Sequence, residues 1–178
     1  MRRLTRFCAR GCARFCAVLL AGVAIAVLAG SVAHAQLLDK KAISLAEAKK
    51  LVAAAEAEAV KQGWPMCIVV VDEGGNQIMA VKMDECQVGS VDVALAKART
   101  AARFKRPTKV FEDFVAGNPK ADPPVPGRNA ILALGVMPLE GGINLVVGGK
   151  TIGAIGCSGA SAAQDGMVCK AGAEALTK

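Results

Sequence analysis

The spacing of apolar residues changes along the chain, and its first long stretch has helical periodicity. Apolar side chains recur every three or four positions over residues 45–59, which places them on one face of a helix. Ser44 and Glu47 form a capping box, in which both side chains satisfy free backbone N–H groups. Gly63 is a residue type that commonly ends helices. A helix is therefore predicted between Ser44 and Gly63.

Two strand patterns follow this helix. Residues 65–71 form a short apolar run, and residues 77–83 alternate between two sets of side chains on opposite faces. Residues 72–76, with the sequence Asp-Glu-Gly-Gly-Asn, separate the two runs and are typical of a turn. Residues 65–83 are therefore predicted to form a β-hairpin.

The middle of the chain returns to helical spacing. Ser90 is predicted to cap a second helix that ends before Pro107, and this helix carries alanines at positions 94, 98, 101 and 102. These small side chains allow another backbone to approach closely. Thr108 is predicted to cap a short helix that runs through Val115. Four prolines within residues 117–127 predict a surface loop after it.

The last third of the chain contains three strand-like runs. They cover residues 135–140, 143–147 and 151–158, and Gly-Gly turns separate them. Ser161 opens a second capping box and a terminal helix. The order helix, two strands, two helices, three strands, helix predicts an α+β domain with a mainly antiparallel sheet and helices packed on it.

The first 35 residues have the pattern of a secretory signal peptide. Arginines precede a 14-residue apolar run from Ala17 to Gly30, and Ala33 and Ala35 fit the rule of small residues before the cleavage site. The run is shorter than the roughly 20 residues that a membrane span needs. We expect cleavage after Ala35, a periplasmic or secreted protein with no membrane segment, and one domain formed by residues 36–178.

Removal of residues 1–35 changes the candidate chemistry. Five arginines leave, so Lys+Arg falls from 22 to 17 against 15 acids, and the net charge falls from +7 to +2. This charge and the few aromatic residues argue against nucleic-acid binding. The single histidine, His34, leaves as well. The expected domain therefore has no imidazole for acid–base catalysis, for a Ser-His-Asp triad, or for ligation of zinc or haem.

Four cysteines remain in the expected domain, which allows two disulfides and three pairings in an oxidising compartment. Cys67 and Cys157 lie in apolar strand-like runs and are compatible with buried thiols. Cys86, in a predicted loop, and Cys169, in the predicted terminal helix, are the pair that we expect to form a bridge.

A cluster of basic residues lies in the second and third predicted helices. Six basic side chains fall within 13 residues with no acid among them: Lys97, Arg99, Arg103, Lys105, Arg106 and Lys109. Arginine can donate two parallel hydrogen bonds to an oxyanion, so the cluster is a candidate site for a small anionic ligand or for porphyrin propionates. A solvated helix face is the alternative, and the residues alone leave both open.

Carboxylates at strand and helix ends are the remaining candidates for acid–base chemistry. They are Asp72, Asp84, Glu140 and Asp165. Carboxylates are common in turns for structural reasons, so a catalytic role is the less favoured interpretation. We expect a protein without enzymatic activity.

An ordered set of short motifs resembles the GlcG/HbpS family. The motifs are Ser44–Ala48, Val70–Gly75, Met83-Asp84, Ala96–Ala101, Phe104, Arg106–Thr108, Leu139–Gly142 and Ile152–Gly159. Members of this family include glycolate-utilisation accessory proteins, extracellular haem-binding proteins and the C-terminal domain of PduO-type corrinoid adenosyltransferases. The resemblance covers about residues 42–176.

The resemblance implies a fold and a ligand. It implies a profilin-like domain, with a five-stranded antiparallel sheet flanked by helices, that assembles into homo-oligomers and binds haem or a related tetrapyrrole. Thr100, Arg103 and Thr108 match the family's central motif, and with Lys97 and Arg106 they are the candidate ligand-binding residues. Without histidine, iron ligation would fall to Met, Cys, Lys or a hydroxyl such as that of Thr108. Otherwise apolar contacts and propionate–arginine pairs would hold the porphyrin.

Three functions follow from these observations. The first is an exported haem- or tetrapyrrole-binding accessory protein. The second is a binding module or small enzyme for a carboxylated metabolite, in which the four carboxylates would move the protons. The third is a structural or partner-docking subunit, because an alanine-rich helix face suits self-association.

Overall fold

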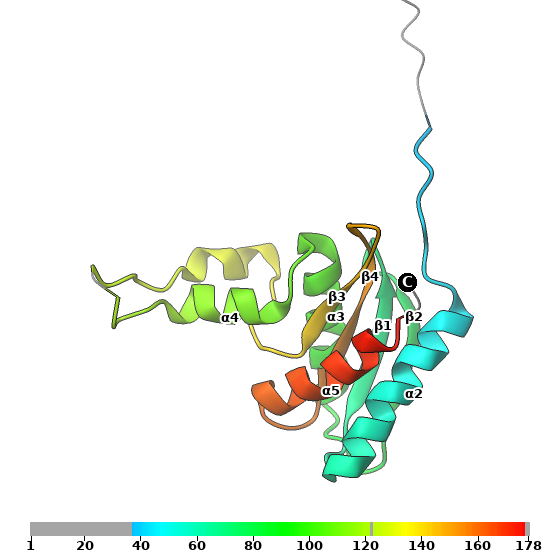
Figure 1. Cartoon of the computed structure of the whole chain (residues 1–178). Helices are drawn as coiled ribbons and strands as arrows, with labels where there is room; N and C mark the ends of the chain where they lie inside the picture. The colour runs from blue at the N-terminus through cyan, green and yellow to red at the C-terminus, as the bar shows by residue number, and fades with distance from the viewer. Residues whose placement is uncertain (1–36, 122, 177–178) are drawn as a thin grey trace, which may run out of the picture. The chain divides into compact units, whose positions relative to one another are not determined.

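The computed structural model describes residues 37–121 and 123–176 of the 178-residue chain. The predicted signal peptide and His34 lie outside these residues. The elements are α2 (Leu45–Gln62), β1 (Cys67–Asp72), β2 (Gln77–Lys82), α3 (Ser90–Phe104), α4 (Thr108–Ala116), the 3₁₀ helix η1 (Asn129–Leu134), β3 (Gly142–Val147), β4 (Lys150–Ser158) and α5 (Ala162–Glu174). The predicted helices and the predicted hairpin are confirmed (Figure 1).

The four strands form one antiparallel sheet in the order β2-β1-β4-β3. Strand β1 is therefore internal, with Ile68 opposite Val81 on one side and opposite Cys157 on the other. The predicted α+β class, with an antiparallel sheet flanked by helices, is confirmed. The sheet has four strands among the described residues, where five were expected.

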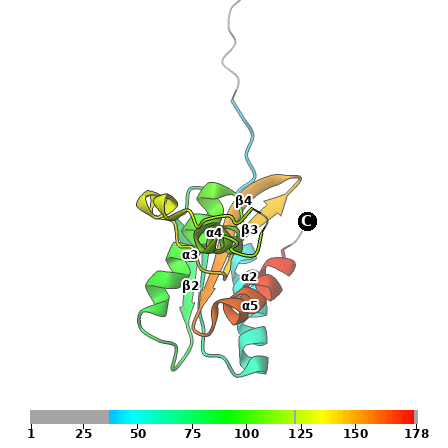
Figure 2. The same cartoon turned by 90° about the vertical axis from the view of Figure 1, so that its left-hand side faces the viewer.

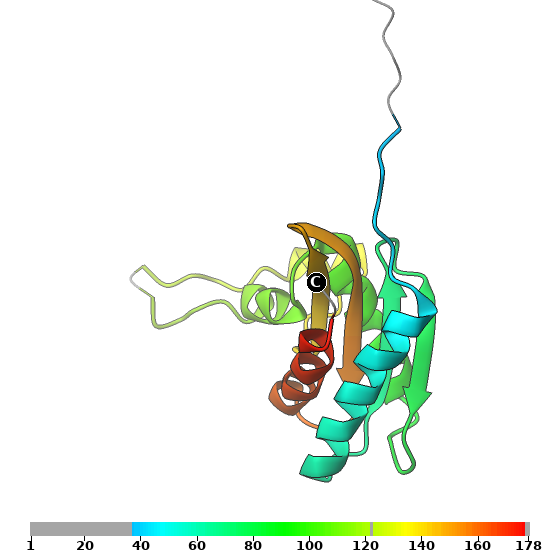
Figure 3. The ribbon, with the colours of Figure 1, turned by 45° about the vertical axis from the view of Figure 1, so that its right-hand side comes forward.

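Helices cover both faces of this sheet. α2 and α5 lie side by side on one face, and α3 lies on the other (Figures 1 and 3). Ile68 and Val70 point into the core under α2 and α5, while Val69 and Val71 point into a second core under α3. Because β1 is buried on both faces, its sequence is a continuous apolar run rather than an alternating one.

The alanine face of α3 packs within the domain. Ala94 and Ala98 are fully buried against the sheet, and β4 carries Gly156 where α3 crosses it. A Cβ atom at Gly156 would lie 2.7 Å from the backbone nitrogen of Ala98 and closer still to the carbonyl oxygen of Ala94. This close approach explains the small residues, so the alanine face does not support self-association.

The segment predicted as a strand at residues 135–140 is not one. Gly135, with φ 70°, ends η1, and residues 136–141 run irregularly to β3. Pro138 has no N–H for a sheet ladder, and the N–H of Met137 donates to the hydroxyl of Thr100 instead. The irregular course of this segment accounts for the missing fifth strand.

α4, the loop after it and η1 extend from the sheet as an arm (Figures 1 and 2). The sequence of η1 is apolar, yet none of its residues is buried, and Leu134 is 68% exposed. Residues 117–121 and 123–127 of the predicted loop lie outside helices and strands, and an isolated antiparallel bridge joins Asn118 and Val125. No helix among residues 37–121 and 123–176 is long and apolar enough to cross a membrane.

Candidate functional site

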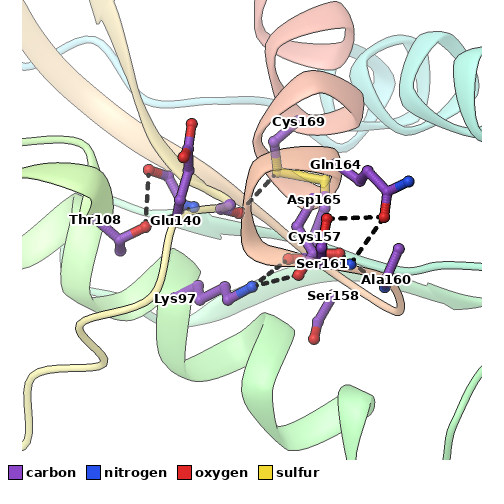
Figure 4. A network of polar contacts seen from close by, with 12 residues as sticks. Lys97, Thr108, Glu140, Cys157, Ser158, Ala160, Ser161, Gln164, Asp165 and Cys169 are labelled. Atoms are coloured by element: carbon purple, nitrogen blue, oxygen red, sulfur yellow. Dashed lines mark hydrogen bonds and ion pairs between the residues drawn. A yellow bond between two sulfur atoms is a disulfide. The ribbon is translucent and has the colours of Figure 1, made fainter. Parts of the chain in front are cut away.

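A buried ion pair joins three elements beneath the basic helix. Nζ of Lys97, on α3, lies 2.6 Å from Oδ2 of Asp165 and donates a 3.2 Å hydrogen bond to the carbonyl oxygen of Cys157 (Figure 4). The two charged side chains are only 1% and 3% exposed. Oδ1 of Asp165 accepts a hydrogen bond from the N–H of Ala160 at 3.0 Å. The pair therefore holds α3, β4 and α5 together, and Lys97 does not reach solvent.

Burial and the ion pair act on Asp165 in opposite directions. Removal from water raises the pKa of this carboxyl above its ordinary value. The hydrogen bond from Lys97 and the N–H of Ala160 offset part of that rise. Because a buried charge without its partner is costly, the two side chains depend on each other for the fold.

Thr100 and Thr108 fasten the segment before β3 to the helices. Oγ1 of Thr100 accepts the N–H of Met137 at 3.0 Å. Oγ1 of Thr108, which is labelled in Figure 4, accepts the N–H of Gly142 at 2.8 Å. Both threonines are buried. Thr108 is the first residue of α4 and its N-cap is Pro107, so the predicted helix-capping role of this hydroxyl is wrong. Likewise, the N-cap of α3 is Gly89 rather than Ser90.

Two arginines of α3 bind the turn between β1 and β2. Nε of Arg99 donates to the carbonyl oxygen of Gly75, and Nε of Arg103 donates to that of Gly74, each at 3.1 Å. Asp72 organises the same turn by accepting the N–H groups of Gly74 and Asn76. Both arginines are exposed, so the outer edges of their guanidinium groups face solvent.

The end of α3 presents free charge beside an aromatic ring. Arg106 is exposed, and its side chain makes no hydrogen bond or ion pair with the described residues. Phe104 is 37% exposed and packs edge-on against Phe111 of α4, with the ring centroids 5.3 Å apart. An external ligand can therefore reach two of the predicted binding residues, Arg103 and Arg106, and also Phe104, which lies between them in the sequence. We call these three residues the α3 end.

The four candidate carboxylates do not form one site. Asp72 is the last residue of β1 and Asp84 follows β2, which puts them at opposite ends of the hairpin. Hydrogen bonds to Asp72, chiefly from the side chain of Asn76, lower the pKa of its carboxyl. The side chain of Glu140 lies over Gly166 on α5, the residue that follows Asp165. Only these last two are near each other, and Asp165 is already paired.

The disulfides differ from the predicted pairing. Cys67 is bonded to Cys86 and Cys157 to Cys169, with Cα–Cα distances of 6.2 and 5.5 Å. The prediction that Cys86 pairs with Cys169 is wrong, because these two residues lie on opposite faces of the sheet. Cys157–Cys169 lies beside the buried ion pair (Figure 4). No group of three or more His, Cys, Asp or Glu residues among those described could hold a metal ion.

Two hollows lie away from most predicted site residues. One, of about 560 Å³, lies on the arm and includes Phe114, whose ring centroid is 4.9 Å from Cζ of Arg128. The other, of about 480 Å³, lies between α2 and β2 beside Trp64 and includes Asp84. The α3 end lines neither of them.

The described domain belongs to the class of small α+β proteins whose antiparallel sheet carries helices on both faces. The chain is a member of the HbpS-like family, described as haem-degrading protein HbpS-like, whose model matches residues 43–174. Protein GlcG of Escherichia coli K12 is 38% identical over 120 residues, which is 67% of this chain and 83% of that protein.

Two solved structures have the same fold. A double mutant of Streptomyces reticuli HbpS is 28% identical with a TM-score of 0.70, covering 83% of this chain and 96% of that one. The PduOC:haem complex is 28% identical with a TM-score of 0.67, covering 77% of this chain and 96% of that one. These likenesses confirm the predicted family.

Some contacts of the site had no signal in the sequence. Lys97 and Asp165 are 68 residues apart, and the hydroxyl partners of Thr100 and Thr108 are backbone groups 37 and 34 residues away. The contact of Arg99 with the turn was also missed. The structure divides the six basic residues of the cluster into a buried lysine, Lys97, two arginines bound to the turn, Arg99 and Arg103, and a lysine paired with acids of its own helix, Lys109. The other two, Lys105 and Arg106, are exposed and have no side-chain partner among the described residues.

Proposed function

We propose that this domain binds haem or a related tetrapyrrole, and that the α3 end receives the carboxylates of the ligand. The observation that carries the proposal is the family match together with the likeness to the PduOC:haem complex. The exposed guanidinium groups of Arg103 and Arg106 suit propionates, since an arginine fork binds a carboxylate through two N–H groups. The ring of Phe104 adds apolar surface beside them.

Lys97, Thr100 and Thr108 take a different part in this proposal. All three are buried, and their polar atoms are bound within the domain. They position α3 and the segment before β3, and they do not touch the ligand. Of the five candidate residues, Arg103 and Arg106 are thus the ones assigned to direct binding.

A haemin titration tests the proposal. Purified protein comprising residues 36–178 is titrated while the Soret band is recorded, next to Arg103→Ala/Arg106→Ala and a control, Lys41→Ala/Lys49→Ala. The control removes the same charge from exposed lysines in and before α2. We expect saturable binding, weakened about tenfold or more in the arginine variant, which corresponds to at least about 1.4 kcal/mol, and unchanged in the control. Absence of saturable binding to the unmodified domain would refute the proposal.

We also propose that the protein is exported and processed after Ala35. The support is the arginine-rich and apolar pattern of residues 1–35 and the presence of two disulfides, which are typical of oxidising compartments. N-terminal sequencing of protein recovered from the cell envelope tests this. A product that starts at Met1 would contradict it.

The second candidate function is binding or conversion of a small carboxylated metabolite. The observation in its favour is that GlcG, at 38% identity, is nearer in sequence than the PduOC:haem complex at 28%. The same exposed arginines, Arg103 and Arg106, suit a small acid. A thermal-shift screen of small carboxylic acids separates the two functions, because a metabolite-binding domain would be stabilised by one of them and would not bind haemin.

The third candidate function is that of a self-associating or partner-docking subunit, with η1 as its contact element. The support is that this apolar helix has no buried residue in the single chain. Light scattering on the unmodified protein and on Leu134→Ser tests it. A strictly monomeric unmodified protein would exclude self-association.

A further inference from the structure

Most of the side chains that usually bind haem iron are either missing from the described domain or already bonded within it. Proteins ligate this iron with imidazole, thiolate, thioether or phenolate groups. The chain has no tyrosine, and its one histidine, His34, lies outside the family match at residues 43–174. The four cysteines of the described residues form two buried disulfides and offer no thiolate.

Two threonines and one lysine of the basic region are not available to the iron, because their polar atoms already have partners within the domain. The hydroxyls of Thr100 and Thr108 are buried and accept backbone N–H groups. The amine of Lys97 is buried in its ion pair. Exposed lysines are protonated at neutral pH, and an ammonium group has no free electron pair for a metal.

Methionine is the remaining donor, and only one is well placed. Met79 and Met83 pack against the core under α2 and α5, and Met167 lies on α5, on the face of the sheet away from α3. Met66 is fully buried. Met137, whose N–H donates to Thr100, is the methionine next to α3 among the described residues.

Apart from Met137, the residues of this region therefore fit the periphery of a porphyrin and not its metal. Arg103 and Arg106 are exposed residues whose two guanidinium groups suit the charge of two propionates, and Phe104 offers a partly exposed ring. These contacts are the same whether or not the porphyrin holds iron. Ion pairing and apolar burial supply the binding free energy, and iron ligation adds none.

We infer that this domain recognises a dicarboxylic porphyrin through its carboxylates and ring and without using the metal, so that it binds the metal-free porphyrin as tightly as haem. This inference rests on the proposed function, since it concerns the same surface. It narrows the ligand class from haem or a related tetrapyrrole to porphyrins with free carboxylates, with or without a metal. It also assigns no iron-binding role to Met137.

Three ligands and two proteins test the inference. The domain of residues 36–178 and its Met137→Leu variant are titrated with haemin, with metal-free protoporphyrin IX, and with protoporphyrin dimethyl ester. We expect dissociation constants for haemin and the metal-free porphyrin within about threefold of each other. We expect at least about tenfold weaker binding of the ester, and no change in either the haemin affinity or the visible spectrum of the haemin complex in Met137→Leu.

The possible failures are distinguishable. Haemin that binds about tenfold or more tighter than the metal-free porphyrin would overturn the inference and leave the proposed function intact. A selective loss of haemin affinity in Met137→Leu would do the same and would assign the ligand. Equal binding of the ester would overturn carboxylate recognition, and no binding of any porphyrin would overturn the proposed function itself.

Discussion

Replacement of Lys97 by methionine tests the central structural claim, that a buried ion pair holds α3 to α5. Methionine is close to lysine in length and apolar, so the main loss is the charge. The carboxylate of Asp165, 3% exposed, would keep the N–H of Ala160 as a hydrogen-bond donor but would lose the cation 2.6 Å away. Removing one partner of a buried pair leaves an uncompensated charge in a medium of low polarity.

The magnitude follows from the burial of both partners. We expect Lys97→Met to lower the free energy of unfolding by about 3–5 kcal/mol near pH 7, or the midpoint of thermal unfolding by roughly 10–20 °C for a domain of this size. Lys97→Met/Asp165→Asn removes both charges and keeps an oxygen that can accept the N–H of Ala160. The double variant should therefore cost much less than the sum of the two single variants.

The pH dependence gives a second readout of the same contact. Burial raises the pKa of Asp165, so the folded state holds this proton more tightly than the unfolded state. Its stabilising contribution is complete below the ordinary aspartate value of 3.8 and is lost as pH rises through the folded-state pKa. Without Lys97 the pKa of Asp165 rises further, so the cost of Lys97→Met should shrink as the pH falls below neutral.

Urea unfolding with the disulfides intact, followed by circular dichroism, measures the free energy of unfolding. It is applied to the unmodified protein, to Lys97→Met, to Asp165→Asn and to the double variant. A cost below about 1 kcal/mol for Lys97→Met at neutral pH would refute the buried ion pair. Strict additivity of the two single variants would refute the coupling between Lys97 and Asp165. A cost that is constant with pH would refute the role assigned to Asp165.

Three further changes test other parts of the fold by the same unfolding assay. Gly156→Ala should cost about 1–3 kcal/mol or more because its Cβ would meet the backbone of α3, whereas Gly89→Ala, whose Cβ meets nothing within 4 Å, should cost little; equal costs would contradict the close approach of α3. Cys157→Ser/Cys169→Ser should cost about 3 kcal/mol by opening a short loop, and mass mapping of the unreduced protein should find this pair linked. Thr108→Val should cost about 1–3 kcal/mol by leaving a buried N–H unbound, and a serine at the same position should restore most of it.

Much of the local structure was predictable because it depends on residues close in sequence. The capping box of Ser44 and Glu47, the αL glycine that ends α2 and the turn at residues 72–76 involve contacts within a few residues. The predictions of the long helices and of the hairpin were correct for that reason. The strand predicted at residues 135–140 was wrong, because a short apolar run has a strand-like pattern whether or not a neighbouring strand exists to pair with it.

The candidate site was predictable in composition and not in geometry. The number of histidines, the four cysteines of residues 36–178 and the basic cluster are properties of the sequence. They set which side chains are available to bind a ligand or a metal. Whether a given basic residue is free for a ligand depends on burial. The folded chain buries Lys97 and leaves Arg106 exposed, although both belong to one run of basic residues.

Within residues 43–174, the sequence by itself determined the chemistry that is possible: no imidazole, four cysteines, and arginines suited to carboxylates. Only the tertiary structure decided the partners, joining Cys157 to Cys169 and Lys97 to Asp165. The physical reason is that both pairs form where β4, α3 and α5 pack together. Packing of distant segments, rather than any local pattern, chooses which groups meet in the absence of water.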